Sequence, residues 1–377
     1  MASLRMGAIE VDPPVVLAPM AGVTDAPFRL LCAQFGGGLF VNQMVTARAL
    51  VEGHRASWEL ARFHPAERTR SLQLYATDAH YAAEATRMLV GRDLVDHIDL
   101  NFGCPAPKVT RNGGGAALPY KRRLLESVIA AVVGAAHEES AGTVPVTVKF
   151  RMGIDDEHLT YLDTGRIAEG CGASAVALHA RTALDHYGPP ARLEAIARLV
   201  EEVPSIPVLG NGDIATAADA TSMMRGTGCA GVVIGRGCLG RPWLFAELQA
   251  AFLGHEVPPG PTLGEVSDVI GRHLGLIQQW YGTGARLAPF RKHLAWYLKG
   301  YPVGPQVRRA AAAVETPRDV EALLERLDPD APAPGDAALF NRSHSNPLRR
   351  VALPDGWLDD PDELPAVAAP TSVLSGG

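Results

Sequence analysis

Residues 206–237 read IPVLGNGDIATAADATSMMRGTGCAGVVIGRG, and this stretch decides the fold. It holds two short runs rich in Val, Leu and Ile, and each run ends in a glycine-containing turn. Between them, residues 217–225 have the composition and spacing of a helix. Two buried strands joined by a crossover helix form a parallel pair, since neighbouring parallel strands need such a connection.

The same pattern recurs through the first two-thirds of the chain. Expected strands lie at 15–20, 39–45, 71–76, 95–103, 144–153, 174–181, 206–213 and 230–237. The helices expected after them lie at 25–35, 51–63, 79–91, 121–137, 159–170, 193–203, 217–225 and 243–253. Eight such pairs over about 250 residues predict a closed (β/α)8 TIM barrel. A doubly wound open sheet is the alternative, because periodicity alone does not prove closure.

The composition and the predicted secondary structure change after residue 254. Residues 255–263, HEVPPGPTL, read as a linker, and 266–327 show helical patterns without strand signals. From residue 328 onward Pro, Asp and Ala dominate. We therefore expect a barrel domain over 1–254, a small all-helical domain over 255–327, and a disordered acidic C-terminal tail over 328–377.

Composition excludes several classes of protein. The 377 residues are 47% hydrophobic and 20% charged, so the chain can bury a full core. The net charge of −6 excludes a uniformly basic nucleic-acid coat. Five scattered cysteines without a CxxC pair argue against a disulfide framework or a metal site. No apolar run of about 18 residues and no signal-peptide pattern occur, so we expect no membrane span and a cytoplasmic location.

A barrel of this type carries its chemistry at the carboxyl ends of its strands. The seventh expected strand ends in Asn211-Gly212-Asp213, and the eighth ends in Gly235-Arg236. Glycine-rich turns before helices expose backbone N–H groups to anions, and Arg236 adds a charged donor. Two adjacent loops of this kind favour phosphate binding over simple tight turns.

Cys104 follows the fourth expected strand in the sequence NFGCPAPK. Most unpaired cysteines are small buried hydrophobes, but a position in a polar loop between prolines favours a chemical role. A thiol with an ordinary pKa is protonated at neutral pH and can act as a general acid. A strongly activated thiol would instead be a nucleophile.

Other expected strand ends add polar groups to the same rim. These are Gln73 on the third strand, Lys149 and Arg151 on the fifth, His179 and Arg181 on the sixth, and a small-residue turn, Pro19-Met20-Ala21, after the first. A phosphate cradle, a lysine and a flat small-residue turn fit a phosphorylated redox ring such as FMN. A lysine near that ring would stabilise its reduced anion.

A second signal lies in the helical region. The span 286–309 contains six basic residues and no Asp or Glu, with four aromatic residues among them. This pattern favours a contact with a nucleic-acid backbone over a merely solvated helix face. The basic residues are Arg286, Arg291, Lys292, Lys299, Arg308 and Arg309.

Taken in order, these stretches resemble the tRNA-dihydrouridine synthases, most closely the bacterial B-type branch. The likeness spans about residues 12–325, and the set of motifs is more specific than any one of them. The matching stretches are LAPMAGVTDAPFR (17–29), SLQLYATD (71–78), IDLNFGCPAPKV (98–109), GGGAAL (113–118), VKFRMG (148–153), ALHARTALDHYG (177–188), VLGNGDI (208–214), GVVIGRG (231–237) and RKHLAWYLKG (291–300).

The resemblance implies an FMN-containing barrel followed by a helical RNA-binding domain. In such enzymes NADPH or NADH reduces FMN, hydride passes to C6 of a flipped-out D-loop uridine, and a cysteine protonates C5 to give 5,6-dihydrouridine. Cys104 would then be the proton donor. Gln43 departs from the family pattern, in which an acidic residue is common at this place. The implied FMN contacts are Pro19, Met20, Ala21, Gln73, Lys149, His179, Asn211, Gly212, Asp213, Gly235 and Arg236. The implied substrate or RNA contacts are Asn101, Arg151, Arg181, Arg286, Arg291, Lys292 and Lys299.

Two other functions share part of this pattern. An FMN barrel acting on a free pyrimidine or dihydroorotate would need the same cofactor and acid but no basic helical domain. An RNA-binding protein with an inactive barrel would have no use for Cys104 or Lys149. We expect the chain to act as a monomer on tRNA, without a metal ion.

Overall fold

The fold is known from a computed structural model, which describes residues 3–335 and 350–365. A nine-stranded sheet runs in the order β4-β3-β11-β10-β9-β8-β7-β6-β5, and every neighbouring pair in it is parallel. Its strands are β3 (Val15–Leu17), β4 (Leu39–Phe40), β5 (Val45–Thr46), β6 (Ser71–Tyr75), β7 (His97–Phe102), β8 (Val146–Arg151), β9 (Ala175–His179), β10 (Val208–Asn211) and β11 (Gly231–Ile234).

The predicted barrel is confirmed, and one segment closes it. β4 pairs with β3, β5 pairs with β6, and Val41 between them bridges Ser71. The expected second strand, 39–45, is therefore two short pieces around Asn42. The Asn42 side chain is fully buried and is held by Arg29 Nη1 at 3.1 Å and by its own bond to the Leu60 carbonyl at 2.6 Å. This polar anchor interrupts the strand without opening the barrel.

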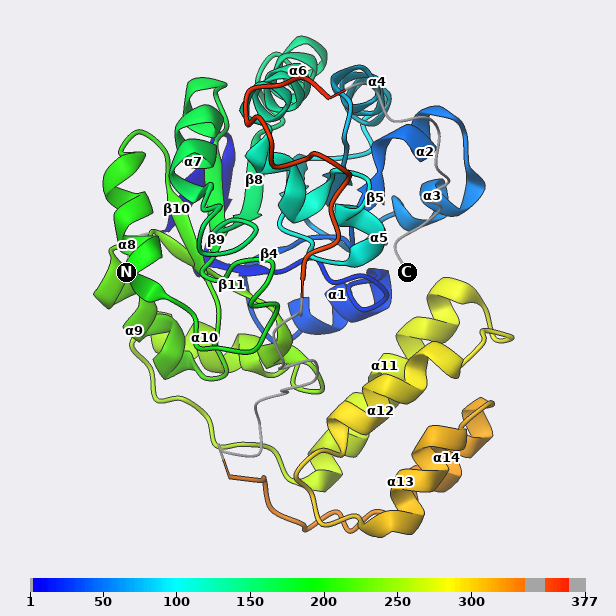
Figure 1. The fold of residues 1–377 in the computed structure, drawn as a ribbon. Helices are drawn as coiled ribbons and strands as arrows, with labels where there is room; N and C mark the ends of the chain where they lie inside the picture. Colours follow the sequence, from blue (N-terminus) through cyan, green and yellow to red (C-terminus); the bar gives the residue numbers. More distant parts are fainter. Residues whose placement is uncertain (1–2, 336–349, 366–377) are drawn as a thin grey trace.

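Helices surround the sheet on its outer side (Figure 1). Their apolar faces pack on the Val, Ile and Leu side chains of the strands to form the main core. The helices of this layer are α1 (Ala26–Ala33), α2 (Ala47–Val51), α3 (Arg55–Leu60), α4 (Ala79–Val90), α6 (Arg122–Ser140), α7 (Tyr161–Gly170), α8 (Leu193–Glu202), α9 (Ala217–Thr227) and α10 (Leu244–Leu253). The short helix α5 (Pro107–Thr110) and the 3-10 turns η1 (Gly115–Tyr120) and η2 (Arg236–Cys238) lie in connections between strands and helices.

An N-terminal hairpin that the sequence patterns did not reveal closes one end of the barrel. β1 (Leu4–Met6) pairs antiparallel with β2 (Ile9–Val11). Leu4, Met6 and Val11 are buried against inward-facing strand residues such as Val16, Ala175 and Leu209. Since the hairpin fills the amino ends of the strands, the carboxyl ends remain available for a site.

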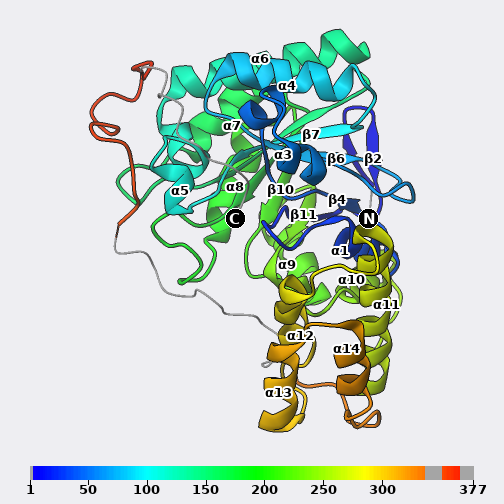
Figure 2. The ribbon, with the colours of Figure 1, turned by 90° about the vertical axis from the view of Figure 1, so that its right-hand side faces the viewer.

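The helical segment packs beside the barrel, below it in both Figure 1 and Figure 2. It has its own apolar core, which also takes in Leu31 of α1. Thr262 starts α11 with a capping box that includes Glu265, and such caps satisfy exposed backbone N–H groups. The elements are α11 (Leu263–Tyr281), η3 (Ala288–Phe290), α12 (Arg291–Tyr297), α13 (Gly304–Ala313) and α14 (Pro317–Leu324).

The C-terminal tail differs from the expected disorder where the structure describes it. Residues 350–365 lie against the barrel, and the Trp357 side chain is buried there with 7% of its surface exposed. An aromatic anchor of this size buries enough apolar surface to hold an otherwise polar segment. The expectation for 336–349 and 366–377 lies outside the described residues. Within the described ranges, no helix is long and apolar enough to cross a membrane.

Candidate active site

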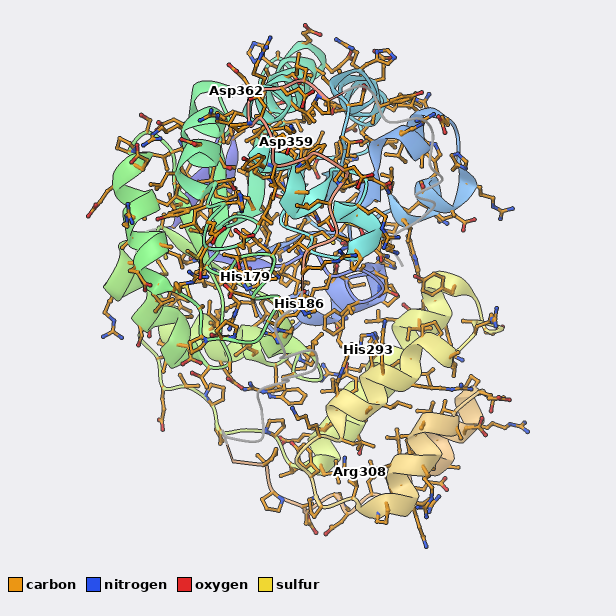
Figure 3. The ribbon with its side chains drawn as sticks, in the orientation of Figure 1. His179, His186, His293, Arg308, Asp359 and Asp362 are labelled. Carbon is orange, nitrogen blue, oxygen red and sulfur yellow. The ribbon has the colours of Figure 1, made fainter. Side chains whose placement is uncertain are left out.

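A pocket opens at the carboxyl ends of β3, β8, β9, β10 and β11, where the sequence predicted the site. It gathers most of the predicted cofactor residues, and His179 marks its position in Figure 3. Ala21 is exposed in the neighbouring turn, and Gln73 lies in the buried layer beside the pocket. The lining residues are Ala18, Pro19, Met20, Lys149, His179, Arg181, Tyr187, Asn211, Gly212, Asp213, Ile214, Val233, Gly235, Arg236 and Gly237.

The lining is rich in cations and hydrogen-bond donors. The Arg236 guanidinium lies 4.3 Å from the centre of the Tyr187 ring. Lys149 Nζ donates to Asn211 Oδ1 at 3.0 Å, and burial lowers the Lys149 pKa to about 8. Burial and the surrounding cations hold the pKa of His179 well below its usual value, so this imidazole is neutral. A donor set of this kind fits an anionic phosphate and an electron-accepting ring.

Among the described residues that line the pocket, Asp213 is the one carboxylate. Arg181 Nη2 contacts both of its oxygens at 2.6 Å, and the Ala191 N–H donates to Oδ2 at 2.8 Å. The charge is therefore neutralised, and the pair fixes the segment 188–192 beside the pocket. Gly212 has φ +138°, and a side chain there would collide with Ala191, so this turn needs glycine.

Cys104 is held at the end of β7 by a chain of hydrogen bonds. Its backbone N–H donates to Asn101 Oδ1 at 3.0 Å, and Asn101 Nδ2 donates to Gln73 Oε1 at 2.7 Å. Gln73 Nε2 in turn donates to Asp99 Oδ2 at 2.7 Å, and Thr147 supplies a hydroxyl to Oδ1 at the same distance. Three predicted residues thus form one network, and the carboxylate at its base fixes the orientation of the Gln73 amide.

The Cys104 thiol sits among groups that oppose and favour its ionisation. Burial is the largest influence and raises its pKa, while Ala106 N–H and the cations of Arg151, Lys108 and Lys149 act in the opposite direction. The net direction is upward, so the thiol is protonated at neutral pH. This is the state that a proton donor needs, and it argues against the nucleophile.

Sequence reasoning missed three residues of the site. Asp99 is buried, and burial raises its pKa to about 6 despite its hydrogen bonds and Lys149. Tyr75 packs with Cys104, and burial raises its pKa. Tyr187 lies between Arg151 and Arg236. The signal available for Asp99 was a carboxylate inside an apolar strand, two residues before Asn101.

Several predicted RNA contacts are engaged inside the protein. Arg151 is 2% exposed and donates to the carbonyls of Gly103, Thr182 and His186. It thereby joins the Cys104 loop after β7 to the loop after β9. Arg291 Nε donates to the Val314 carbonyl at 2.7 Å, and its Nη2 lies 3.4 Å from Glu315 Oε1. The carboxylate that pairs with Arg291 therefore belongs to Glu315, which lies outside the span 286–309.

Lys292 forms a bridge between the helical segment and the barrel. Its Nζ donates to the Gly22 carbonyl at 2.6 Å, and Tyr281 donates to Asp25 Oδ2 at 3.1 Å nearby. Gln43 Oε1 accepts from the Gly22 N–H at 2.7 Å, so the residue that departs from the family pattern supports this turn. Arg286 is exposed in the loop after α11, and Lys299 is partly buried near the end of α12.

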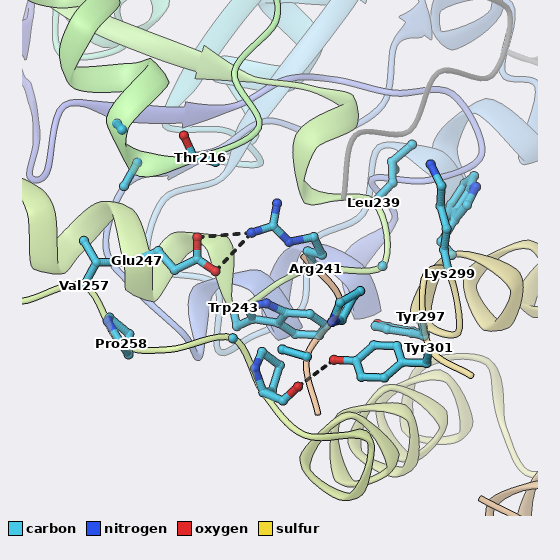
Figure 4. A pocket seen from close by; sticks show the side chains of 18 residues that line it. Thr216, Leu239, Arg241, Trp243, Glu247, Val257, Pro258, Tyr297, Lys299 and Tyr301 are labelled. Atoms are coloured by element: carbon cyan, nitrogen blue, oxygen red, sulfur yellow. Dashed lines mark hydrogen bonds and ion pairs between the residues drawn. The ribbon is translucent and has the colours of Figure 1, made fainter. Parts of the chain in front are cut away.

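A second cavity, of about 310 Å³, lies between the barrel and the helical segment (Figure 4). Its Arg241 side chain is paired with Glu247 at 3.1 Å, and Tyr301 donates to the Pro261 carbonyl at 2.6 Å. Although it is the larger cavity, Cys104 and Lys149 are absent from its lining. We therefore place the chemistry in the smaller pocket at the strand ends.

The fold is a closed parallel TIM barrel. At the carboxyl ends of its strands it has a pocket lined with cations, which suits an anionic ligand, and a protonated thiol lies at the end of a neighbouring strand. Residues 16–331 match the sequence profile of the family described as "Dihydrouridine synthase (Dus)". The chain belongs to this family.

Known proteins with similar sequences carry related names. A "Probable tRNA-dihydrouridine synthase" of Mycobacterium tuberculosis is 55% identical, with 100% of this chain and 97% of that protein covered. A "tRNA-dihydrouridine synthase B" of Xanthomonas axonopodis is 39% identical over 89% of this chain and 100% of that protein. The structure of histamine dehydrogenase from Rhizobium sp. 4-9 is similar, with a TM-score of 0.51 at 11% identity over 73% of this chain and 50% of that chain. At this identity the likeness supports the barrel fold alone.

Proposed function

We propose that the protein is a flavin-dependent tRNA-dihydrouridine synthase. It reduces the C5–C6 bond of a uridine in the D-loop of tRNA, uses FMN as its bound cofactor, and takes electrons from NADPH or NADH. Membership of the dihydrouridine synthase family and the names of the similar proteins support this assignment. Because its substrate is tRNA, we place it in the cytoplasm, and we propose that it acts as a monomer without a metal ion.

One observation carries the proposal. Asn101 accepts a hydrogen bond from the backbone N–H of Cys104 at the end of β7, burial keeps the Cys104 thiol protonated, and Lys149 on the adjacent strand is near enough to influence the pKa of that thiol. The C5–C6 double bond of uracil is conjugated to the C4 carbonyl, so hydride addition at C6 leaves an enolate, and an acid such as this thiol must supply the proton that C5 takes up. A barrel retained only for RNA binding would have no need to hold a thiol in this state.

The chain's own residues divide the work of holding the cofactor. Gly212, Gly235 and Arg236 would hold the phosphate, since their loops offer N–H groups and a guanidinium. Lys149, His179 and Asn211 would contact the ring, with Pro19, Met20, Ala21 and Gln73 beside it. When bound, the flavin supplies hydride for C6 of the uracil. Cys104 then donates its proton to C5.

The uridine must leave the base stack of the tRNA to reach this pocket. Asn101 and Arg181 would contact the base, and Arg151, which donates to the Gly103 carbonyl, would fix the loop beside it. We propose that residues 255–327 form the tRNA-binding domain, with Arg286, Arg291, Lys292 and Lys299 on the side that faces the RNA. The bridge from Lys292 to Gly22 supports this arrangement, because it places α12 next to the turn after β3.

A flavin reoxidation experiment tests the proposal. The purified holoenzyme is reduced with NADPH under anaerobic conditions, and flavin absorbance is followed after addition of unmodified tRNA, uracil or orotate. Reoxidation by tRNA alone, with dihydrouridine in the product, is the expected result. Reoxidation by a free pyrimidine instead would assign the protein to small-molecule metabolism and overturn the proposal.

A further inference from the structure

The described part of the C-terminal tail contacts the loop that carries Cys104. Residues 350–365 lie beyond the stretch 16–331 that matches the family, so family membership gives them no role. In Figure 1 the red segment crosses the barrel over α5 and the start of α6, and Figure 2 places it beside α5. The connection between β7 and α6 runs from Gly103 to Lys121 and contains both Cys104 and α5.

Trp357 is the anchor of this contact. Its Nε1 donates to the Ala117 carbonyl at 3.0 Å, and its ring packs so closely on Gly113 that a side chain at that position would overlap the indole. The Lys121 ammonium lies 5.4 Å from the ring centre, a cation–π arrangement. The indole thus contacts the connection at three points, on both sides of η1.

Polar contacts extend the same interface along α6. Tyr120 donates to the Leu358 carbonyl at 2.9 Å, and Lys121 Nζ donates to the Asp360 carbonyl at 2.7 Å. Arg122 forms a two-point pair with Asp362 at 2.6 and 2.8 Å. Asp359 and Asp362, which are labelled in Figure 3, show where this part of the tail lies, over the upper part of the barrel in that view. Lys121 is 1% exposed, so it depends on the tail for its partners.

A short path leads from Trp357 to the thiol. Residues 113–116 join Gly113, which the indole covers, to Ala116, whose N–H donates to the Cys104 carbonyl at 3.0 Å. Gly115 has φ +53°, and a side chain there would overlap the Cys104 backbone. The turn therefore rests directly on Cys104 on one side and on Trp357 on the other.

We propose that residues 350–365 form a clamp that holds the Cys104 loop in position, with Trp357 as its positioning residue. Asn101 fixes the backbone of Cys104 from the strand side, and the clamp fixes it from the opposite side through Gly113–Ala116. Protonation of C5 depends on the placement of the Cys104 thiol, whereas reduction of the flavin does not use it. This inference rests on the proposed role of Cys104 as proton donor.

The test compares the two half-reactions in Trp357→Ala. We expect the flavin content and the rate of flavin reduction by NADPH to stay within about twofold of the wild type. Reoxidation at saturating tRNA should slow roughly ten- to a hundredfold, since small misplacements of a catalytic group cost this much. Affinity for tRNA should be unchanged, so the loss appears in kcat and not in KM.

A second readout does not require tRNA turnover. The rate at which iodoacetamide alkylates Cys104 in the holoenzyme, measured by peptide mapping, should change at least severalfold in Trp357→Ala. The thiol of Cys171 contacts Glu126 on α6 and serves as an internal reference. If the wild-type enzyme fails to react with tRNA, the proposed function fails, and alkylation still decides whether the clamp acts on Cys104.

Two further variants complete the design. Trp357→Phe keeps an aromatic ring but loses the bond to Ala117, so it should show a smaller effect, and it takes over the comparison if Trp357→Ala does not fold. Asp355→Ala changes an exposed tail residue outside the interface and should behave as the wild type. Unchanged reoxidation and alkylation in both Trp357 variants would overturn the proposal. Equal losses in both half-reactions would also overturn it, because Trp357 would then support the whole fold.

Discussion

Among single residues, Cys104 shows most directly how environment sets chemistry. The cations around it favour the thiolate, but burial outweighs them and raises the pKa. A reactive thiolate would need the opposite balance, a low pKa in an exposed electropositive site. The structure therefore places a protonated thiol at the end of β7, which is the state that the proposed role of proton donor requires.

Replacement of this acid gives the first prediction. Cys104→Ala should keep its flavin and its reduction by NADPH, but reoxidation by tRNA should fall by about 10² to 10⁴, the usual contribution of a general acid. In the wild type the reoxidation rate should hold through neutral pH and decline only in alkaline solution, where the thiol ionises. Stopped-flow absorbance measures both rates. Full reoxidation by Cys104→Ala would remove the proton-donor role.

Lys149 gives the second prediction, which concerns cofactor affinity. Burial lowers its pKa to about 8 in the protein without cofactor, whereas hydrogen-bond acceptors of the flavin ring beside it and the phosphate in the same pocket would favour the charged form. Binding of FMN should then take up a proton, so affinity falls as pH rises above about 8, by at most about tenfold per pH unit. Lys149→Arg should bind with little pH dependence, and Lys149→Met should bind weakly throughout. Fluorescence titration of apoprotein with FMN between pH 6 and 10 separates these outcomes.

At the scale of elements, α11 and α12 are joined by buried histidines. His273 on α11 contacts Tyr297 on α12 through Nδ1 and the hydroxyl at 3.0 Å, and His293 packs against it at 4.8 Å between ring centres. Burial lowers the pKa of His273 to about 3 and holds that of His293 well below its usual value. The folded state therefore keeps both rings neutral, while the unfolded chain binds protons below about pH 6.5.

This difference gives the third prediction. The pKa of His273 is lower in the folded protein than in the unfolded chain. Its contribution to the free energy of unfolding is therefore complete above about pH 6.5 and is lost as the pH falls below that value. At pH 5 the buried His273 lowers the free energy of unfolding by about 2 kcal/mol relative to pH 7. His273→Gln should lessen the pH dependence of the urea midpoint, whereas the exposed-site control His255→Gln should leave it unchanged. Equal slopes in all three proteins would contradict the assignment.

The elements also show which features a sequence can reveal. Strands such as β8 and β10 were predictable because continuous Val, Ile and Leu runs are typical of buried parallel strands. The position of the site was also predictable, because parallel strands present their carboxyl ends at one edge of the sheet. The hairpin of β1 and β2 was not, because three-residue strands give no periodic signal. Trp357 lies in a short stretch without helical or strand periodicity, and its burial depends on contacts with residues far along the chain, such as Ala117.

The site was predictable only in its first layer. Gln73, Lys149 and Asn211 are polar side chains in apolar strands, a pattern that predicts one shared rim. The fold brings Lys149 and Asn211 together in the pocket, whereas Gln73 lies in the buried layer beside it. Asp99 lies behind them, and its role follows only from the geometry of Gln73. Likewise, the pairing of Arg291 with Glu315 needs α12 and α13 to be packed, which local composition cannot indicate.

For the whole molecule, the question is how a chain of net charge −6 binds a polyanion. Some basic side chains of the span 286–309 form hydrogen bonds within the protein. Arg291 donates to the Val314 carbonyl, and Arg308 donates to the Tyr301 carbonyl. Charge reversal at Arg291 would therefore break helix packing as well as any RNA contact. Arg286 is the better probe, because it is exposed in the loop after Tyr281, which itself contacts Asp25 of the barrel.

The last prediction separates local contact from overall charge. Arg286→Glu and Arg309→Glu change the net charge equally, and both side chains are exposed. Arg309 lies on α13, which both views place farther from the barrel than α11 (Figures 1 and 2). If tRNA spans the barrel mouth and the adjacent helical loop, Arg286→Glu should weaken binding and reduce the slope of log K against log salt by about 0.7 to 0.9, because one phosphate fewer is neutralised. Arg309→Glu should keep the wild-type slope. Filter binding from about 50 to 200 mM salt measures both, and equal effects would mean that tRNA responds to the overall charge of the protein instead of to this loop.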